Sequence, residues 1–236
     1  MTELSASRIA RLLGIAAMAV WAALLSAPAP SASAEPCPDV EVIFARGSGE
    51  PPGVGGVGQS FVDALRSQVG TKSLSVYPVN YVASTDFGDP IAFASTVIDG
   101  IRDAGAHVQA TATGCPNTRM VLGGYSQGAA VAGFVTSANV PAGVPVAAVP
   151  QPLPPEVANH VAAVVLFGEP SDAWVTQYGA PPIVIGPAYA TKTLKLCADG
   201  DTICNGTPGG GPSAAHALYP VNGMVGEGAS FAAGKL

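Results

Sequence analysis

The amino-acid sequence predicts an α/β protein, a three-layer α/β/α sandwich built around a central, mostly parallel sheet of five strands. The first observation is that short apolar, β-branched runs alternate along the chain with longer stretches of helical character, as in proteins whose parallel strands are joined by crossover helices. The second is composition, because 48% of the residues are hydrophobic and only 11% are charged, which excludes intrinsic disorder. The sequence also contains no internal repeat.

The expected strands are the apolar runs, and the expected helices are the longer stretches between and after them. In chain order, strands are expected at Val40–Ala45, Leu74–Asn80, Met120–Gly123, Val161–Phe167 and Thr193–Leu196. Helices are expected at Val57–Val69, Ile91–Ala112, Gln127–Ser137 and Gly223–Ala233. Because crossovers between parallel strands are right-handed, these helices should cover both faces of the sheet.

Residues 139–155, the Pro-rich segment, interrupt this alternation. They contain six prolines, which exclude a helix or an inner strand. The segment follows the helix expected at Gln127–Ser137, and so it should lie at the opposite end of the sheet from the carboxyl ends of the strands, where open α/β sheets bind ligands. We therefore expect a peripheral connection and not an active-site lid.

The first 34 residues have the features of a secretory signal peptide. Arg8 and Arg11 precede an apolar run from Leu12 to Leu25, and a Pro/Ser/Ala stretch ends in the small residues Ala32-Ser33-Ala34. The run is too short to span a bilayer about 30 Å thick, although an uncleaved anchor is the alternative. Residues 35–236 should then form a single domain in a secreted protein, with association with the cell envelope left open.

Export determines how the four cysteines are interpreted. An even number of cysteines in an oxidising compartment indicates two disulfides. Cys197 and Cys204 lie close together around a turn-prone stretch and should pair, which leaves Cys37 with Cys115. A metal site is the alternative, but no His or Cys lies at ligand spacing, so neither a metal nor a cofactor is expected.

The sequence Gly124-Tyr125-Ser126-Gln127-Gly128 is the strongest local signal for chemistry. A buried-strand run precedes it and a helical, alanine-rich run follows it. A serine between strand and helix, with a glycine two residues away on each side, is typical of the nucleophile elbow, a tight turn in which these two positions must be small. This turn exposes the serine hydroxyl at a helix N-terminus, where the dipole favours a developing oxyanion. A plain glycine-rich turn is the alternative.

A serine nucleophile needs a base, and the chain has three histidines. His107 lies within an expected helix, and His160 lies at the amino end of the fourth strand. His216 lies in a loop after the last strand, where the chain returns to the catalytic end. Since the order in this fold is Ser, acid, His, we predict His216 as the base.

The acid should lie between the nucleophile and the base, at the carboxyl end of a strand. Glu169 and Asp172 follow the fourth strand, and Asp199 and Asp201 follow the fifth. A small disulfide ring would fix an acid that orients the imidazole. Spacing alone does not separate Asp199 from Asp201.

An oxyanion hole needs two donors near the nucleophile. One should be the backbone N–H of Gln127, immediately after Ser126. The other should come from residues 45–50 after the first strand, where Gly47 and Gly49 allow close approach and the Ser48 hydroxyl offers a donor.

After residue 34, the sequence resembles the cutinases, most closely the secreted cutinase-like proteins of mycobacteria. The resemblance is carried, in chain order, by Phe44-Ala45-Arg46-Gly47-Ser48, Gly123-Gly124-Tyr125-Ser126-Gln127-Gly128-Ala129, Leu166-Phe167-Gly168, Cys197-Ala198-Asp199-Gly200-Asp201-Thr202-Ile203-Cys204 and Ala215-His216. It implies a compact α/β-hydrolase fold, selects Asp201 as the acid, implies the Cys37–Cys115 bridge, and supports Ser48 and Gln127 as oxyanion-hole residues. Residues 83–90 and 205–214 match the substrate-binding loops of the family.

The resemblance implies a secreted serine esterase that hydrolyses esters of short to medium acyl chains through an acyl-enzyme. An acetylxylan esterase, or a phospholipase or lipase, is the alternative on the same scaffold, and a non-catalytic binding protein is a more distant one. With 16 acidic against 10 basic residues, a nucleic-acid binder that uses a basic face is excluded. We expect an ester or lipid substrate, a monomer, and no transmembrane segment after the cleavage site.

Overall fold

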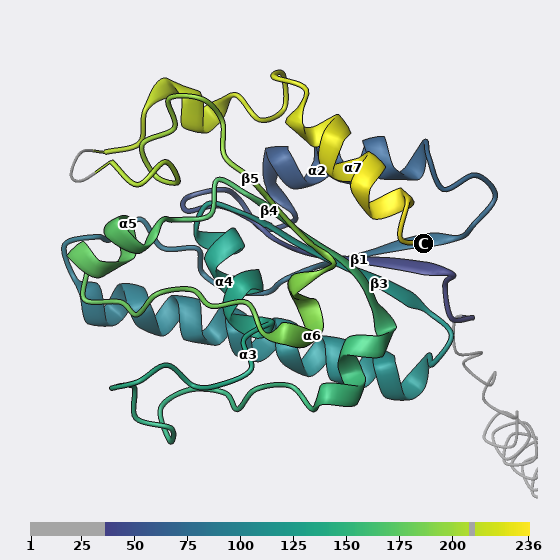
Figure 1. The fold of residues 1–236 in the computed structure, drawn as a ribbon, viewed down its shortest axis with the longest axis horizontal. Helices are drawn as coiled ribbons and strands as arrows, with labels where there is room; N and C mark the ends of the chain where they lie inside the picture. Colours follow the sequence, from purple (N-terminus) through teal and green to yellow (C-terminus); the bar gives the residue numbers. More distant parts are fainter. Residues whose placement is uncertain (1–35, 208–210) are drawn as a thin grey trace, which may run out of the picture. The chain divides into compact units, whose positions relative to one another are not determined.

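Five parallel strands form one sheet at the centre of the structure, in the spatial order β2-β1-β3-β4-β5 (Figure 1). The structure, a computed structural model, describes residues 36–207 and 211–236, so the expected signal peptide lies outside the described residues. The strands are β1 (Val40–Ala45), β2 (Leu74–Pro78), β3 (Arg119–Tyr125), β4 (Val161–Phe167) and β5 (Thr193–Leu196). Every neighbouring pair is parallel, and the predicted α/β fold class is confirmed.

Two strands end at residues that differ from the prediction. β2 ends at Pro78, because the N–H of Asn80 donates to the Asp103 carboxylate (2.8 Å) and no longer to the sheet. β3 continues past its predicted end at Gly123 through Gly124 to Tyr125, two residues that the sequence analysis assigned to the turn. A Cβ at Gly123 would lie 2.7 Å from the Phe44 ring, so this glycine allows the core to approach the strand closely.

Helices cover both faces of the sheet (Figure 1). α2 (Gly55–Arg66) and α7 (Met224–Ala233) pack on one face, and α3 (Pro90–Gly114) and α4 (Gln127–Val135) pack on the other. The sequence did not predict four short helices: α5 (Asp172–Gln177), α6 (Pro187–Ala190) and the 3-10 helices η1 (Pro155–His160) and η2 (Ala214–Ala217). Each of them is too short to produce a helical period in the sequence.

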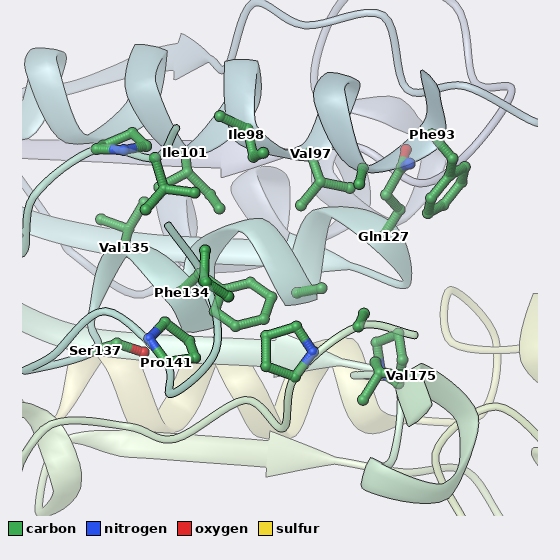
Figure 2. Close-up of a pocket in the computed structure, with 18 of the residues that line it drawn as sticks. Phe93, Val97, Ile98, Ile101, Gln127, Phe134, Val135, Ser137, Pro141 and Val175 are labelled. Atoms are coloured by element: carbon green, nitrogen blue, oxygen red, sulfur yellow. The ribbon is translucent and has the colours of Figure 1, made fainter. Parts of the chain in front are cut away.

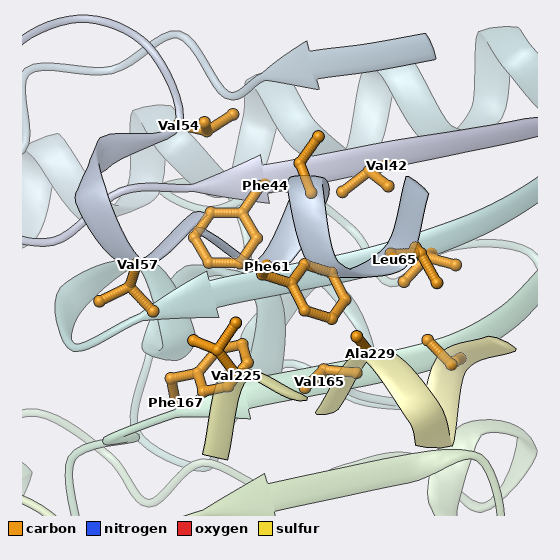
Figure 3. Close-up of a cluster of buried hydrophobic side chains, with 14 of the residues drawn as sticks. Val42, Phe44, Val54, Val57, Phe61, Leu65, Val165, Phe167, Val225 and Ala229 are labelled. Atoms are coloured by element: carbon orange, nitrogen blue, oxygen red, sulfur yellow. The ribbon is translucent and has the colours of Figure 1, made fainter. Parts of the chain in front are cut away.

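Alternate residues of β1 enter the two halves of the core. Val42 and Phe44 point toward α2 and α7, whereas Ile43 belongs to the cluster under α3 and α4. The rings of Phe44, Phe61 and Phe167 lie 5.6–6.4 Å apart, centroid to centroid, at the centre of the first cluster (Figure 3). Such aromatic contacts stabilise a core beyond the area that they bury.

Two disulfide bonds are present, Cys37–Cys115 and Cys197–Cys204. The first joins the segment before β1 to the residue after α3, and the second closes the loop that follows β5. Across residues 36–207 and 211–236, no helix combines the length and apolar character that a membrane span requires. Since all strands are parallel, the loops after β1, β3, β4 and β5 meet at one edge of the sheet.

Candidate active site

The turn from β3 into α4 holds Ser126 in a backbone conformation that few residues other than glycine adopt. Its φ is 56° and its ψ is −118°. The Ser126 N–H donates to the Phe167 carbonyl (2.9 Å), and the Ser126 carbonyl accepts the Ala129 N–H (2.9 Å). Ser126 is the N-cap of α4, so its side chain lies at the positive end of the helix dipole.

The two glycines of the elbow are required by close backbone contacts. A Cβ at Gly124 would lie 2.1 Å from the carbonyl oxygen of Gly128. A Cβ at Gly128 would lie 1.9 Å from the carbonyl oxygen of Ala45. Neither neighbour is a flexible side chain, and so neither can move away without displacing β1 or α4.

We expect Gly128→Ala to lower the free energy of unfolding by more than about 4 kcal/mol, because the added methyl group overlaps the backbone of β1. Thermal unfolding of the purified variant, or its absence from the soluble fraction, measures this. Gly226→Ala is the matched control, since Gly226 lies in α7 and a Cβ there would meet open space. A Gly128→Ala protein with the wild-type Tm would contradict the tight contact.

Three side chains form a continuous hydrogen-bonded row at the edge of the sheet. The Ser126 Oγ lies 2.8 Å from Nε2 of His216, and Nδ1 of His216 lies 2.8 Å from Oδ2 of Asp201. Asp201 comes from the loop after β5 and His216 from η2. Asp201 is fully buried and His216 is 7% exposed, while Ser126 is partly open. The arrangement can move a proton from the serine hydroxyl to an imidazole that a carboxylate orients.

Two tyrosines that the sequence analysis missed hold this row in place. The Tyr219 hydroxyl donates to Oδ2 of Asp201 (2.6 Å) and accepts the N–H of Ala198 (3.0 Å). The Tyr125 hydroxyl donates to the His216 carbonyl (2.6 Å), and its ring stacks on the imidazole with centroids 5.0 Å apart. Tyr219 lies three residues after His216, and this closeness to the base was the feature of the sequence that could have indicated its role.

The environment of Asp201 favours its charged form. Burial raises the pKa of this carboxyl, but hydrogen bonds from His216, from the Tyr219 hydroxyl and from the Ile203 N–H together hold it below 3.8. Burial and the neighbouring carboxylate raise the pKa of Tyr219, which therefore remains a donor. Asp201 is accordingly ionised at neutral pH, the state in which it can accept the imidazole N–H.

We expect Tyr219→Phe to lower the free energy of unfolding by about 2–3 kcal/mol, because the buried carboxylate of Asp201 loses a donor. Since the folded pKa of Asp201 is lowered, this difference should be complete above pH 3.8 and disappear as the pH falls through that folded pKa. Denaturant unfolding of both proteins at several pH values measures it.

Tyr189→Phe is the matched control for that experiment, because the buried Tyr189 hydroxyl has no hydrogen-bond partner among the described residues. Its unfolding free energy should stay within about 0.5 kcal/mol of the wild-type value or rise. Equal effects of the two substitutions would exclude a specific contribution of the Tyr219 hydroxyl.

The other candidate acids lie away from His216. Glu169 is buried and pairs with Lys195, with Oε2 and Nζ 2.9 Å apart. Asp172 lies in the first turn of α5, and Asp199 is exposed. Asp201 is thus the one candidate carboxylate that contacts the imidazole in the part of the chain that the structure describes.

The other two histidines also lie away from Ser126. His107 lies between α3 and the sheet, where it stacks on the ring of Tyr77 from β2 and places Nε2 3.1 Å from Oε1 of Glu41 from β1. His160 precedes β4, and its Nδ1 lies 3.1 Å from the Pro116 carbonyl. Among the described residues, no group of three or more His, Cys, Asp or Glu side chains could hold a metal ion.

The loop after β1 is held beside the elbow by its own side chains. The N–H of Gly47 donates to Oε2 of Glu50 (2.7 Å), and Nε of the buried Arg46 donates to the Glu50 carbonyl (2.8 Å). Ser48 lies within this loop, and together with Gln127 it lines the pocket that contains Ser126. Gln127 follows Ser126 directly in the chain, and Ser48 borders the same pocket as Ser126.

A large pocket of about 1230 Å³ is lined by Ser126 and His216. Figure 2 shows part of its lining, with Gln127 at one end. Residues 139–155, the Pro-rich segment, contribute much of its wall, so the expectation of a merely peripheral connection is wrong. The segment does leave α4 at the end away from Ser126, as predicted, but it then runs back beneath α3 and covers that helix (Figure 1). Phe87 from residues 83–90 and Pro212 from residues 205–214 also line the pocket.

The parallel sheet and the strand–serine–helix turn define an α/β-hydrolase. Residues 36–236 match the family model described as Cutinase, and the chain therefore belongs to the cutinase family. It is a cutinase-like carboxylesterase, a carboxylic ester hydrolase, as its relatives indicate.

Two curated relatives come from Mycobacterium tuberculosis. The probable carboxylesterase Culp7 is 67% identical over 170 residues, which cover 72% of this chain and 89% of the relative. Carboxylesterase Culp1 is 46% identical over 232 residues, which cover 97% of this chain and 96% of the relative. Among solved structures, a Trichoderma reesei cutinase in complex with a phosphonate inhibitor is 32% identical, with a TM-score of 0.60 over 84% of this chain and 76% of that one.

Proposed function

We propose that this chain is an exported serine esterase that hydrolyses carboxylic esters through an acyl-enzyme on Ser126. The Ser126 Oγ attacks the ester carbonyl carbon while Nε2 of His216 accepts its proton. Asp201 accepts the hydrogen bond from Nδ1 of His216 and stabilises the imidazolium that forms. His216 then donates the proton to the leaving alcohol, and a water molecule releases the acyl group by the same route.

The negative charge of the tetrahedral intermediate needs donors that are already in place. The backbone N–H of Gln127 lies at the N-terminus of α4, where the helix dipole adds to its effect. Ser48 borders the same pocket, on the loop that Arg46 and Glu50 hold. The resemblance to the cutinases implies that esters of short to medium acyl chains are among the substrates.

The observation that carries this proposal is the unbroken row of contacts from Ser126 through His216 to Asp201, each 2.8 Å long, with Ser126 and His216 lining a large pocket. A serine next to a neutral base becomes nucleophilic only when the base is oriented, and the buried carboxylate of Asp201 meets that need. The pocket is needed as well, because it gives an ester space to bind beside these three side chains.

Covalent labelling tests the proposal directly. A p-nitrophenyl phosphonate ester should inactivate the enzyme in a time-dependent way and add one phosphonyl group to the peptide that contains Ser126, as judged by mass spectrometry. The related Trichoderma reesei cutinase was solved with a phosphonate inhibitor, which supports this choice of probe. Label on another residue, or hydrolysis of p-nitrophenyl butyrate that survives full labelling, would overturn the assignment of Ser126.

Removing the Ser48 hydroxyl should weaken oxyanion stabilisation. We expect Ser48→Ala to lower kcat for p-nitrophenyl butyrate by about 10²-fold, with KM nearly unchanged, because the lost hydrogen bond forms only in the transition state. Steady-state kinetics measure this. Ser67→Ala is the control, because the Ser67 hydroxyl lies at the end of α2, donates to the Ala64 carbonyl and is outside the pocket lining. An unchanged kcat would leave only the backbone of Ser48 as a donor.

We also propose that the enzyme is exported and is a monomer. The apolar run at Leu12–Leu25 with a small-residue cleavage site supports export, and so do the two disulfides, which persist in oxidising compartments. Residues 35–236 would then be the mature enzyme, a single domain. Secretion into the medium and retention at the cell envelope are both compatible with this proposal.

A further inference from the structure

The pocket extends far beyond the space that a short ester would occupy. Its volume of about 1230 Å³ lies above the range of about 300–1,000 Å³ that is common for small-molecule sites. Ser126 and His216 line this pocket, and Gln127, the residue after Ser126, lies at one end of it in Figure 2. Most of the volume therefore lies beyond the reacting atoms and is available to the part of the substrate that does not react.

One wall of the pocket is a row of apolar residues along α3. Phe93, Val97, Ile101 and Gly105 recur at intervals of four residues and therefore share one face of the helix. The three larger side chains of this row are only partly buried, although they are apolar. Val97 and Ile101 pack on one side against the core cluster under α3 and α4, and their remaining surface borders the pocket. α4 and the Pro-rich segment form the facing walls (Figure 2).

The length of this row can be estimated from helix geometry. In Figure 2, Phe93 and Gln127 lie at one end of the pocket and Ile101 and Val135 lie toward the other. From Phe93 to Gly105 the helix advances by about 18 Å, at about 1.5 Å per residue. The acyl chains of one leaflet of a bilayer occupy about 15 Å, half of the hydrocarbon thickness. The pocket therefore matches a lipid acyl chain in length.

The character of the lining matches a hydrocarbon chain as well. Among the described residues that line the pocket, Arg102 is the one permanently charged side chain, and it is exposed and paired with Asp99. The opposite wall carries Pro141, Val144 and Leu153 from the Pro-rich segment. A wall of this kind offers few hydrogen bonds to a sugar or a peptide but removes methylene groups from water.

We propose that the pocket between α3, α4 and residues 139–155 binds the acyl chain of a long-chain ester, of about the length found in membrane lipids. The inference rests on the proposed function, since it places the acyl carbonyl at Ser126. The leaving alcohol then lies at the open mouth of the pocket, near Ser48 and Pro212. Each methylene group that enters the pocket should improve binding by about fourfold.

Gly105 offers a way to shorten the pocket without touching the catalytic residues. A Cβ at this position would meet only Leu153 Cδ2, at 3.9 Å, across the far part of the pocket. Gly105 lies in the interior of α3 with an ordinary helical backbone, so a larger residue is compatible with the fold. Gly105→Phe should fill the far part, and Gly105→Ala is the matched control, because it changes the helix in the same way and adds little volume.

The first experiment compares p-nitrophenyl butyrate and p-nitrophenyl palmitate as substrates. We expect Gly105→Phe to lower kcat/KM for the palmitate ester by tenfold or more and to leave the butyrate ester within about twofold, while Gly105→Ala changes neither. Equal kcat/KM values for palmitate hydrolysis in Gly105→Phe and Gly105→Ala would overturn the proposal. If the wild-type enzyme hydrolyses neither ester, that result would contradict the proposed function instead.

The second experiment does not depend on catalysis. Calorimetric titration of palmitate into Ser126→Ala should show binding, and adding Gly105→Phe to that variant should weaken it by tenfold or more. Adding Gly105→Ala should leave the Kd within about twofold. Absence of palmitate binding, or binding that Gly105→Phe does not change, would overturn the long-chain proposal whatever the outcome of the activity assays.

Discussion

Ser126→Ala should abolish ester hydrolysis, with a decrease in kcat of about 10⁶-fold. The alanine variant retains the pocket, the ordered His216–Asp201 pair and the backbone donors, but it has no oxygen that can attack the ester carbonyl. The activity that remains should be that of water in a site that still stabilises an oxyanion. Hydrolysis of p-nitrophenyl butyrate, followed over hours at high enzyme concentration, is sensitive enough to measure it.

The control for this substitution must remove a serine hydroxyl elsewhere. Ser60→Ala in α2 is suitable, since the Ser60 hydroxyl bonds only to the Gly56 carbonyl of its own helix and lies outside the pocket lining. Its kcat should equal that of the wild type. Both variants should also unfold at temperatures close to the wild-type Tm, so that a loss of activity cannot come from a loss of folded enzyme. Substantial turnover by a folded Ser126→Ala protein would place the nucleophile elsewhere.

The turn that carries Ser126 could be predicted from the local sequence, because its shape depends on the local backbone. A buried strand, a serine between two glycines and an alanine-rich helix can be recognised without any tertiary contact. The structure places the glycines where a Cβ would overlap backbone atoms, and it gives Ser126 its positive φ. The fold class could be predicted for a similar reason, since the inner strands of a covered parallel sheet are rich in apolar residues, and β4 is apolar throughout.

The choice between Asp199 and Asp201 could not be made from spacing. Both follow β5 and both lie in the small disulfide ring. What separates them is burial, because Asp201 is turned inward to the Tyr219 hydroxyl and the Ile203 N–H while Asp199 is exposed. Burial of this kind depends on a partner far along the chain, and the family resemblance supplied the information that local pattern lacked.

The Pro-rich segment was misjudged because its starting point says little about its course. The segment departs from the end of α4 that lies away from Ser126, and that observation suggested a remote position. The path back along α3 places proline and valine side chains opposite the apolar row of α3, so that this row faces a walled pocket and not bulk solvent. The sequence signal for this path would have been the wide apolar face of α3, for which the sequence analysis assigned no packing partner.

Tyr125 illustrates a further limit. Its position inside the elbow motif was visible in the sequence, but its hydroxyl bonds to the carbonyl of His216, 91 residues later. Burial raises its pKa to about 12, so the hydroxyl stays protonated and can hold the 3-10 helix that carries His216. Such a contact depends on how two segments far apart in the sequence pack together, and no local sequence pattern indicates it.

Asp201→Asn should lower kcat by about 10⁴-fold while the fold and the pocket remain, because asparagine has nearly the same shape as aspartate. The amide can donate a hydrogen bond to Nδ1 of His216, which favours the tautomer whose proton sits on Nε2. That proton would then face Ser126, and the imidazole could no longer accept the serine proton. The imidazolium formed during attack would also lack its counter-charge.

The matched control is Asp199→Asn, which removes the same charge two residues away at an exposed position and should leave kcat within about twofold. Steady-state hydrolysis of p-nitrophenyl butyrate distinguishes the two variants at neutral pH. The pH dependence offers a second measurement, because hydroxide can replace the general base, so the residual activity of Asp201→Asn should rise steeply above neutral pH. Equal activities of the two asparagine variants would mean that the carboxylate of Asp201 supports the fold alone, and the proposed role of the buried acid would be lost.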